Sequence, residues 1–283
     1  MGKFRDRVLL YWGLKEWLGV NDPDQDVLFF GMYNDLDYDT YRIHQGKKIV
    51  FWCGGDILWL KNNWDYQRVI KLFPKAEHYC ENRVEKAELE NLGVKVKEVI
   101  PSFLENIHNF PVCFKPTNEP HIWMCGNPER EKEYGWDLAE RLARKLPEFT
   151  FHLYGSNREK SPRFFDQLEE ISTEVPNLIH HGKVSEEQFN KEIQQYHCGL
   201  RPNDFDGFSE VVAKSIFLGQ YPITKIPYEK IWNYKTEDEL VDLLKAIKYQ
   251  IKPNLEARSY YLKKINQFPF LENRKKFYVL KHD

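Results

Sequence analysis

Residues 201–223, RPNDFDGFSEVVAKSIFLGQYPI, combine the residue types that bind an anionic group. A predicted strand ends at Pro202, an acidic turn follows, and a helix begins at Ser209. Gly207 lets the backbone approach a ligand closely, and Ser209 is a good helix-capping residue. The N–H groups of the first helical turn then point beyond the helix start, which is a geometry that binds phosphate. The stretch therefore predicts a site for a diphosphate.

The elements that must position this stretch are strands and helices in alternation, which is typical of parallel sheets covered by helices. In the first part of the chain we expect strands at 8–11, 27–32, 48–52, 78–80 and 94–100 and clear helices at 65–73 and 83–92. Gly93 ends the second of these helices as a C-terminal cap. Residues 108–120 contain three prolines and no period, and they predict a linker between two domains.

After the linker the alternation restarts. We expect strands at 121–125, 150–154, 178–181 and 197–201 and helices at 134–145, 163–174, 186–196 and 209–218. Thr236 opens an amphipathic helix that ends at Lys248, and residues 254–283 indicate one or two further helices. The prediction is an α/β protein of two Rossmann-like domains, at residues 1–110 and 111–254, with a C-terminal helix at 255–283.

Charge and hydropathy exclude several classes of protein. The 41 basic and 43 acidic residues give a net charge of −2, so a nucleic-acid-binding arm is not indicated. The apolar runs are of strand length and the start of the chain is charged, so we expect neither a membrane-spanning helix nor a signal peptide. Five cysteines without a Cys-x-x-Cys pair predict reduced thiols and a cytoplasmic location.

The opening stretch resembles the donor-site signature of the GT-B glycosyltransferases of the glycogen-synthase-like, mostly retaining superfamily. That signature reads Pro-Ser-x-x-Glu-Gly-Phe-Gly-x-x-x-x-Glu-Ala, followed by Gly-x-Pro-Val, and residues 202–223 keep its spacing. Asp206 keeps the charge of the first glutamate, whereas Lys214 reverses the charge of the second. The resemblance implies two domains with parallel sheets facing a cleft. It also implies a nucleotide-sugar donor held mainly by residues 111–254 and a C-terminal helix packing back on the acceptor-side domain.

A second predicted strand end is similar to the loop whose cations neutralise the leaving diphosphate in that family. Gly126 ends the strand, and Arg130 and Lys132 follow within six residues. Lys132 matches the family lysine by its spacing, and the planar guanidinium of Arg130 suits phosphate oxygens. The alternative is a charged surface loop in which these cations pair with neighbouring glutamates.

Two further turns resemble those that hold the base and the ribose, and each follows a predicted strand. They are Gly155-Ser156 and the Lys183-Val184 pair after Gly182. At the helix start, the resemblance assigns Gly207, Phe208 and Ser209 to the donor. Glu210 either contacts the sugar or ribose, or pairs with Lys214 four residues later on one helix face.

Two acidic features leave alternatives open. Asp56 follows a strand and a glycine turn that resembles an acceptor-side turn of the family, so it is a candidate for an acceptor contact or a base, or else for a helix-capping residue. Asp204 and Asp206 also form an Asp-x-Asp pair, which in another glycosyltransferase fold binds a divalent metal. In the GT-B register these residues need no metal, and we expect none.

The prediction is a hexosyltransferase-like glycosyltransferase that moves a sugar from a nucleotide-diphosphate sugar to an unidentified acceptor, with retention and without a metal or other cofactor. Asp206 would hold sugar hydroxyls, while Lys132, Arg130 and the helix start would stabilise the charge on the leaving phosphate. The acceptor is a glycan, a small molecule, a protein or a modified nucleic acid. One alternative is a nicotinamide enzyme, but no Gly-x-Gly-x-x-Gly turn follows the first apolar run. The other is a non-catalytic nucleotide- or sugar-binding protein with a degenerate GT-B site.

Overall fold

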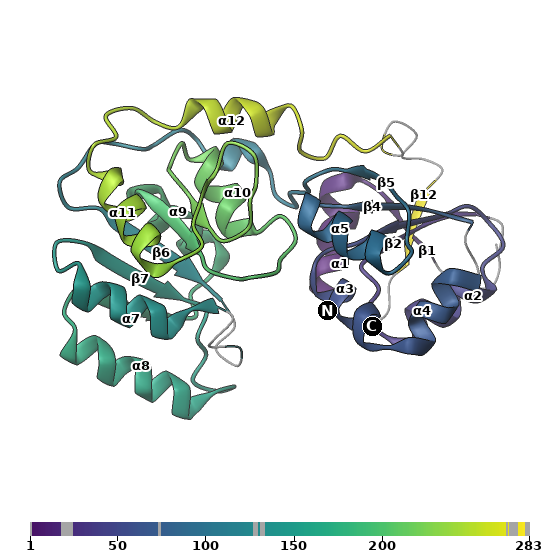
Figure 1. The fold of residues 1–283 in the computed structure, drawn as a ribbon, viewed down its shortest axis with the longest axis horizontal. Helices are drawn as coiled ribbons and strands as arrows, with labels where there is room; N and C mark the ends of the chain where they lie inside the picture. Colours follow the sequence, from purple (N-terminus) through teal and green to yellow (C-terminus); the bar gives the residue numbers. More distant parts are fainter. Residues whose placement is uncertain are drawn as a thin grey trace. The chain divides into compact units, whose positions relative to one another are not determined.

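The computed structural model describes residues 2–17, 25–72, 75–126, 130, 134–269, 271 and 277–280. Its contacts divide the chain into two compact units (Figure 1). Unit 1 comprises Met1–Asn106, Phe205–Phe208 and Lys263–Asp283, and unit 2 comprises Ile107–Asp204 and Ser209–Leu262. The short segment Phe205–Phe208 thus clusters with unit 1, although the residues before and after it belong to unit 2.

Unit 1 contains a six-stranded parallel sheet in the order β1-β12-β2-β3-β4-β5. Its strands are β1 (Lys15–Trp17), β2 (Asp26–Phe30), β3 (Lys48–Phe51), β4 (Ala76–Cys80), β5 (Val96–Val99) and β12 (Phe277–Leu280). Its helices are α1 (Gly2–Trp12), α2 (Asp35–Ile43), α3 (Gly55–Asn62), α4 (Trp64–Leu72) and α5 (Arg83–Asn91).

The central strands of unit 1 are covered on both faces. Val27 and Phe29 of β2 pack into one hydrophobic cluster, and Leu28 and Phe30 pack into another. Alternate side chains of a strand point to opposite faces, so both faces of β2 are buried. A strand buried in this way has a continuous apolar sequence, which is why β2 could be predicted from its composition.

The predicted strand at 8–11 is wrong, because these residues form part of helix α1. Val8 and Trp12 are four residues apart and both are buried, whereas Leu10 is 73% exposed. Burial with this spacing is helical, since residues i and i+4 share one face of a helix. A short apolar run fits either structure, so the run alone did not distinguish them.

The C-terminal part of the chain also differs from the prediction. Helix α12 (Leu255–Leu262) is present and belongs to unit 2, but β12 forms a strand where helix was expected. β12 lies between β1 and β2, and Val279 is fully buried there. A parallel strand between two distant partners depends on pairing that local sequence does not encode.

Unit 2 contains a second six-stranded parallel sheet, in the order β11-β10-β9-β6-β7-β8. Its strands are β6 (His121–Cys125), β7 (Thr150–Tyr154), β8 (Leu178–Gly182), β9 (Cys198–Arg201), β10 (Ile223–Thr224) and β11 (Trp232–Asn233). Its helices are η1 (Ile107–Asn109), α7 (Trp136–Lys145), α8 (Pro162–Glu174), α9 (Glu186–Glu192), η3 (Ile193–Gln195), α10 (Glu210–Phe217), α11 (Glu237–Ile247) and α12.

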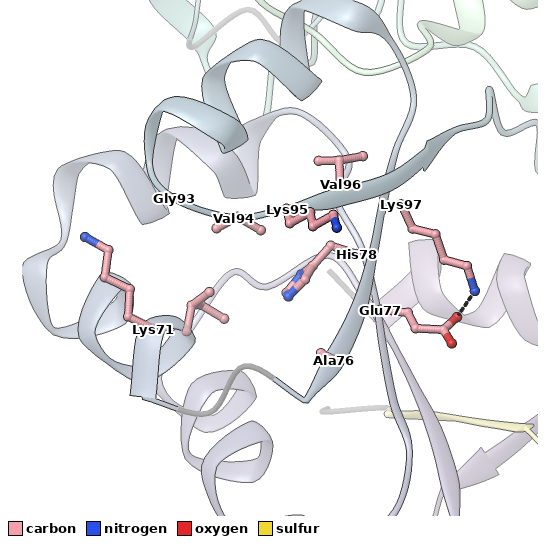
Figure 2. Close-up of a pocket in the computed structure, with 10 residues that line it drawn as sticks. Lys71, Ala76, Glu77, His78, Gly93, Val94, Lys95, Val96 and Lys97 are labelled. Atoms are coloured by element: carbon pink, nitrogen blue, oxygen red, sulfur yellow. Dashed lines mark hydrogen bonds and ion pairs between the residues drawn. The ribbon is translucent and has the colours of Figure 1, made fainter.

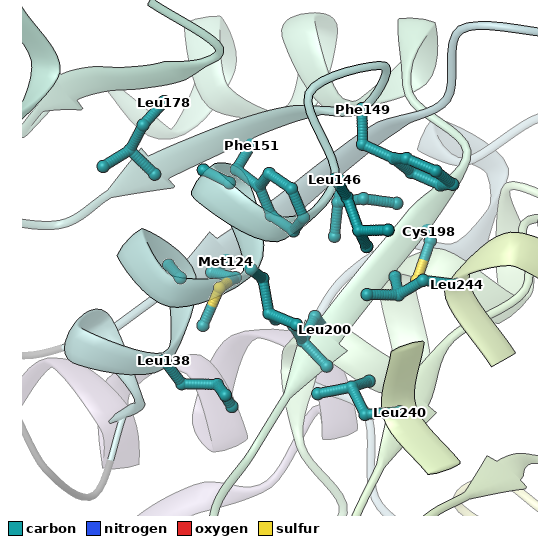
Figure 3. Packing of buried hydrophobic residues seen from close by; sticks show 14 of the residues in the cluster. Met124, Leu138, Leu146, Phe149, Phe151, Leu178, Cys198, Leu200, Leu240 and Leu244 are labelled. Atoms are coloured by element: carbon teal, nitrogen blue, oxygen red, sulfur yellow. The ribbon is translucent and has the colours of Figure 1, made fainter. Parts of the chain in front are cut away.

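The main core of unit 2 joins α7, α8 and α11 to the sheet (Figure 3). Leu138 of α7 and Leu240 of α11 pack with Met124 and Leu200 of the strands. Helix α11 begins at the predicted cap. The Thr236 side chain accepts the N–H of Glu239, and the Glu239 side chain accepts the N–H of Thr236. Within the described residues, no helix has the length and apolar character needed to cross a bilayer.

Replacing Leu200 with Ala tests this core. Leu200 is 1% exposed, so the cavity left behind should lower the free energy of unfolding by about 2–5 kcal/mol. Leu255→Ala is the control in the same unit, because Leu255 is 50% exposed and should change stability by less than about 1 kcal/mol. Urea denaturation measures both, and equal losses would contradict the assignment of Leu200 to the core.

Candidate functional site

Three of the predicted turns meet at the carboxyl ends of β6, β7 and β8 in unit 2. The Gly126 N–H donates to the carbonyl of Tyr154 at 3.1 Å, and the Gly155 N–H donates to the carbonyl of Gly182 at 2.9 Å. Gly155 has φ of +108°, and a Cβ atom there would overlap the carbonyl oxygen of Gly126. The turns therefore touch through their backbones at the edge where parallel sheets bind ligands.

Cationic side chains lie at the same edge. The guanidinium of Arg201, at the end of β9, donates to the carbonyl of Cys125 at 3.2 Å and lies 4.5 Å from the centre of the Tyr134 ring. The guanidinium of Arg130 lies 5.9 Å from the same ring. Lys132, the other predicted cation, lies outside the described residues. Arg201 was not predicted as a site residue, although its position at a strand end next to β6 is the signal that could have identified it.

Ser156 is turned inward. It is fully buried, and its hydroxyl is hydrogen-bonded to Nε2 of His180. Nδ1 of His180 in turn lies 3.0 Å from a carboxylate oxygen of Glu169. Ser156 therefore fixes the turn after β7 and does not present its side chain to a ligand in this structure.

Lys183 and Val184 follow Gly182 at the end of β8. Lys183 is exposed and Val184 is half-buried. The ammonium group of Lys183 is therefore the accessible charge of this turn.

The start of helix α10 has the predicted cap, since the Ser209 hydroxyl accepts the N–H of Val211 at 3.2 Å. Glu210 is half-buried in the first turn. Lys214 is 3% exposed and donates to the side-chain oxygen of Asn190 at 2.9 Å, and its ammonium group lies 5.1 Å from the Phe189 ring. The position that carries a glutamate in the family signature is thus occupied by a buried cation.

The segment Phe205–Phe208 is fastened to unit 1 by its backbone. The Phe208 N–H donates to a carboxylate oxygen of Glu81 at 2.8 Å, and the Asn82 side chain donates to the carbonyl of Asp206 at 2.8 Å. A Cβ atom on Gly207 would overlap the Glu81 carboxylate, and one on Gly54 would lie 2.7 Å from the Gly207 nitrogen.

The glycine turn before Asp56 and the acidic turn at 206–207 therefore touch within unit 1. The Asp206 carboxylate accepts the N–H of Gly207 at 3.0 Å, which shapes the acidic turn. The Phe208 N–H, predicted to bind a diphosphate, already donates to a carboxyl group of the chain itself. A phosphate oxygen there must replace Glu81.

Glu81 belongs to a group of buried carboxyl groups. Its other oxygen accepts the N–H of Ser102 at 3.2 Å and the Ser102 hydroxyl. Glu85 is fully buried and accepts the N–H of Glu81 at 2.6 Å. Burial raises the pKa of both carboxyl groups, and the charge of Asp206 raises the pKa of Glu81 further. These groups therefore hold protons at a higher pH than exposed glutamates do.

Asp56 supports a turn. It is fully buried, and its carboxylate accepts the N–H groups of Met32 at 3.1 Å, Cys53 at 3.0 Å and Ile57 at 3.0 Å. Burial raises the pKa of Asp56 to about 7. The three backbone bonds favour the structural interpretation of Asp56 over a contact with an acceptor.

Three histidines form a hydrogen-bonded row across β6, β7 and β8. Nδ1 of His121 lies 2.8 Å from Nε2 of His152, and Nδ1 of His152 lies 2.9 Å from Nε2 of His181. Nδ1 of His181 then faces the Glu192 carboxylate at 3.7 Å. If each Nδ1 carries the proton, every imidazole donates towards Glu192 and the whole row is neutral. Burial lowers the pKa of His152 to about 3, with smaller contributions from His121 and His181.

Solved structures with a similar fold are glycosyltransferases. The S. aureus protein TarM matches with a TM-score of 0.63 at 13% identity, over 88% of this chain and 53% of TarM. The pneumococcal O-GlcNAc transferase GtfA, solved with UDP and GlcNAc, matches with a TM-score of 0.58 at 15% identity, over 90% of this chain and 56% of GtfA. Anabaena HepE, solved with UDP, matches with a TM-score of 0.65 at 11% identity, over 84% of this chain and 74% of HepE.

The chain has the GT-B fold. It spans about half the length of TarM and GtfA. No protein-family model matches the sequence, and a search of curated proteins gives no match either. In the described part of the chain, no three histidine, cysteine, aspartate or glutamate side chains are grouped as metal ligands.

Gly207→Ala should release the segment Phe205–Phe208. The added methyl group displaces the Glu81 carboxylate, and a hydrogen bond to a charged group contributes about 1.5–3 kcal/mol. Hydrogen exchange at the Phe208 amide should therefore be at least about tenfold faster. Gly55→Ala is the control, because its methyl group would meet a Tyr33 ring carbon at 3.8 Å, an ordinary contact distance. Unchanged exchange in Gly207→Ala would show that Glu81 does not hold the segment.

The histidine row predicts that unit 2 loses stability in acid. His152 has a lower pKa in the folded state than its ordinary 6.5, so the unfolded chain binds more protons below pH 6.5 and stability falls as the pH falls towards 3. The loss from one such group is up to about 1.4 kcal/mol per pH unit. His152→Phe should make the dependence of the unfolding free energy on pH shallower between pH 6.5 and 5. His108→Phe, at an exposed position, is the control, and the same slope in both variants would refute the assignment.

Proposed function

We propose that the protein is a glycosyltransferase that transfers a sugar from a nucleotide-diphosphate sugar to an acceptor. The observation that carries the proposal is the set of touching glycine turns and nearby cations at the carboxyl edge of the unit 2 sheet, in a chain with the GT-B fold. GtfA and HepE, which share this fold, were solved with UDP. The proposed donor is therefore a nucleoside diphosphate sugar, with a hexose as the sugar.

The nucleotide would lie on the turns after β7 and β8. The exposed Lys183 would supply a charge for a phosphate there. Arg130, Lys132 and Arg201 would stabilise the negative charge that forms on the leaving phosphate. This is electrostatic catalysis, in which cations placed in advance lower the barrier without a protein nucleophile.

Transfer would proceed with retention and without a metal. As the bond from the anomeric carbon to the phosphate breaks, an oxocarbenium-like centre forms and the phosphate takes the electron pair. The same phosphate oxygen can then accept the proton of the attacking acceptor hydroxyl. Asp206 would bind sugar hydroxyls, and Glu210 is a second candidate for such a contact.

Glu81 adds a proton-linked step to donor binding. A phosphate oxygen that takes the Phe208 N–H would displace the Glu81 carboxyl group, and two anions cannot share one donor without repulsion. Because burial raises the pKa of Glu81, the carboxyl group can leave the amide as a neutral acid. Donor affinity should accordingly fall as rising pH ionises Glu81.

A second candidate function is binding without catalysis. Two observations favour it: Lys214 is buried where the family signature has a glutamate, and the Phe208 N–H is occupied by Glu81. In that case the site would recognise a nucleotide or a sugar and carry out no transfer.

Calorimetric titration and a nucleotide-release assay with UDP, GDP, ADP and dTDP sugars test the proposal. We expect one nucleotide series to bind and to be turned over, with the rate unchanged by EDTA. Lys183→Ala should weaken binding about tenfold, the effect of losing one charge-assisted hydrogen bond. Lys191→Ala, at an exposed position of α9, is the matched control.

Each remaining outcome decides between the candidates. Binding without turnover, with several acceptor classes supplied, would establish the non-catalytic alternative. Absence of binding to every donor would overturn the proposal, and equal effects of the two lysine variants would remove Lys183 from the site.

A further inference from the structure

Unit 1 contains a pocket of about 520 Å³ at the opposite edge of its sheet from Glu81 and Asp56 (Figure 2). It is lined by the first residues of β4, by the end of α4 and by residues 93–97, which lead into and form part of β5. Glu81 and Asp56 follow the carboxyl ends of their strands, whereas this pocket lies at the amino-terminal ends. It therefore takes no part in the site described above.

His78 provides a fixed hydrogen-bond donor in this pocket. The indole N–H of Trp52 donates to Nδ1 of His78 at 3.2 Å, so the proton of the neutral ring is on Nε2. Burial lowers the pKa of His78 to about 4, so the ring is neutral at physiological pH. His78 is 6% exposed, and its Nε2–H has no hydrogen-bond partner within the described residues. Figure 2 shows its ring in the middle of the lining residues.

The lining residues also carry an excess of positive charge. Lys71, Lys95 and Lys97 line the pocket together with a single carboxylate, Glu77. Glu77 is already shared by Lys97 at 2.8 Å and by Lys47 at 3.0 Å. In the described part of the chain, Lys95 forms no ion pair.

The surroundings of the pocket are positive as well. Lys48 begins β3 and Lys75 directly precedes β4, and the pKa of Lys48 is lowered by burial and by the charge of Lys75. The carboxyl ends of α4 and α5 lie at the same edge and attract cations, but each contributes only about half of a negative charge. The positive charge of the lysines is larger than the negative charge of these two helix ends.

We propose that this pocket binds a phosphate group of a ligand. The His78 Nε2–H would donate from the floor, and Lys95 would bind another oxygen of the same group. A tetrahedral dianion has enough acceptor oxygens to satisfy donors that approach from several elements, and cations at the rim compensate its charge. The phosphate belongs to a soluble phosphate ester or to a lipid headgroup, and the chemistry of the site is the same for both. The proposal does not depend on the proposed glycosyltransferase activity.

Titration of the 15N-labelled protein with inorganic phosphate tests the pocket. The His78 Nε2 resonance should shift and saturate, and Lys95→Ala should weaken the affinity about tenfold. Lys86→Ala is the matched control, because Lys86 is a half-buried lysine of α5 that lies outside the pocket lining and pairs with Glu90. His78→Phe keeps a ring of similar size and should abolish saturable binding, with a thermal melt to verify that it is folded.

Vesicles distinguish the two sources of phosphate. Binding to vesicles with phosphatidic acid but not to pure phosphatidylcholine, lost in Lys95→Ala, would identify a lipid headgroup. Binding of inorganic phosphate without binding of either vesicle would identify a soluble ester. The proposal is overturned if His78 shows no saturable shift, or if Lys95→Ala and Lys86→Ala bind phosphate as the wild type does.

Discussion

The hydrogen bond between the Phe208 N–H and the Glu81 carboxylate is the interaction on which our account of this chain depends. Glu81 is buried and binds Ser102 through its other oxygen, so a single side chain joins the end of β4, the 102 loop and the segment Phe205–Phe208. A buried carboxylate that loses such a partner bears the full cost of its missing solvation, about 1–3 kcal/mol or more. Removing this contact therefore costs stability unless another hydrogen-bond partner replaces it.

That constraint explains the composition of the acidic turn. Phe205 packs against a hydrophobic cluster of unit 1 and Asn82 holds the Asp206 carbonyl, so both ends of the turn are anchored. Gly207 has no room for a side chain beside Glu81. In our proposal a phosphate replaces Glu81, because a backbone N–H near a helix start can donate to either anion. The Phe208 N–H would thus have a hydrogen-bond acceptor both with and without a ligand.

The sequence was sufficient where the signal was local. The strands at 121–125 and 150–154 and the cap at Thr236 were predicted correctly, because short runs rich in β-branched and aromatic residues and a capping pattern are contained in a few residues. The structure also joins three of the predicted glycine turns at one sheet edge, as parallel strands require.

Features set by distant pairing could not be predicted. Glu81 is 127 residues from Phe208, so nothing near either residue indicated their bond. The histidine row depends on the register between β6, β7 and β8. The place of β12 depends on its pairing with β1 and β2, which are distant in the sequence. Ser156 lies in a turn with the expected sequence, but its side chain points to His180 because a buried hydroxyl requires a partner. The position of this turn was predictable from the sequence, and the direction of the Ser156 side chain was not.

The most direct test of the central claim is the amide resonance of Phe208 during titration with UDP, read together with the carboxyl resonance of Glu81. The account predicts that the amide shifts with saturation while the Glu81 carboxyl group gains a proton and leaves it. If UDP binds and both resonances stay where they were, the phosphate lies elsewhere and Glu81 is a purely structural residue.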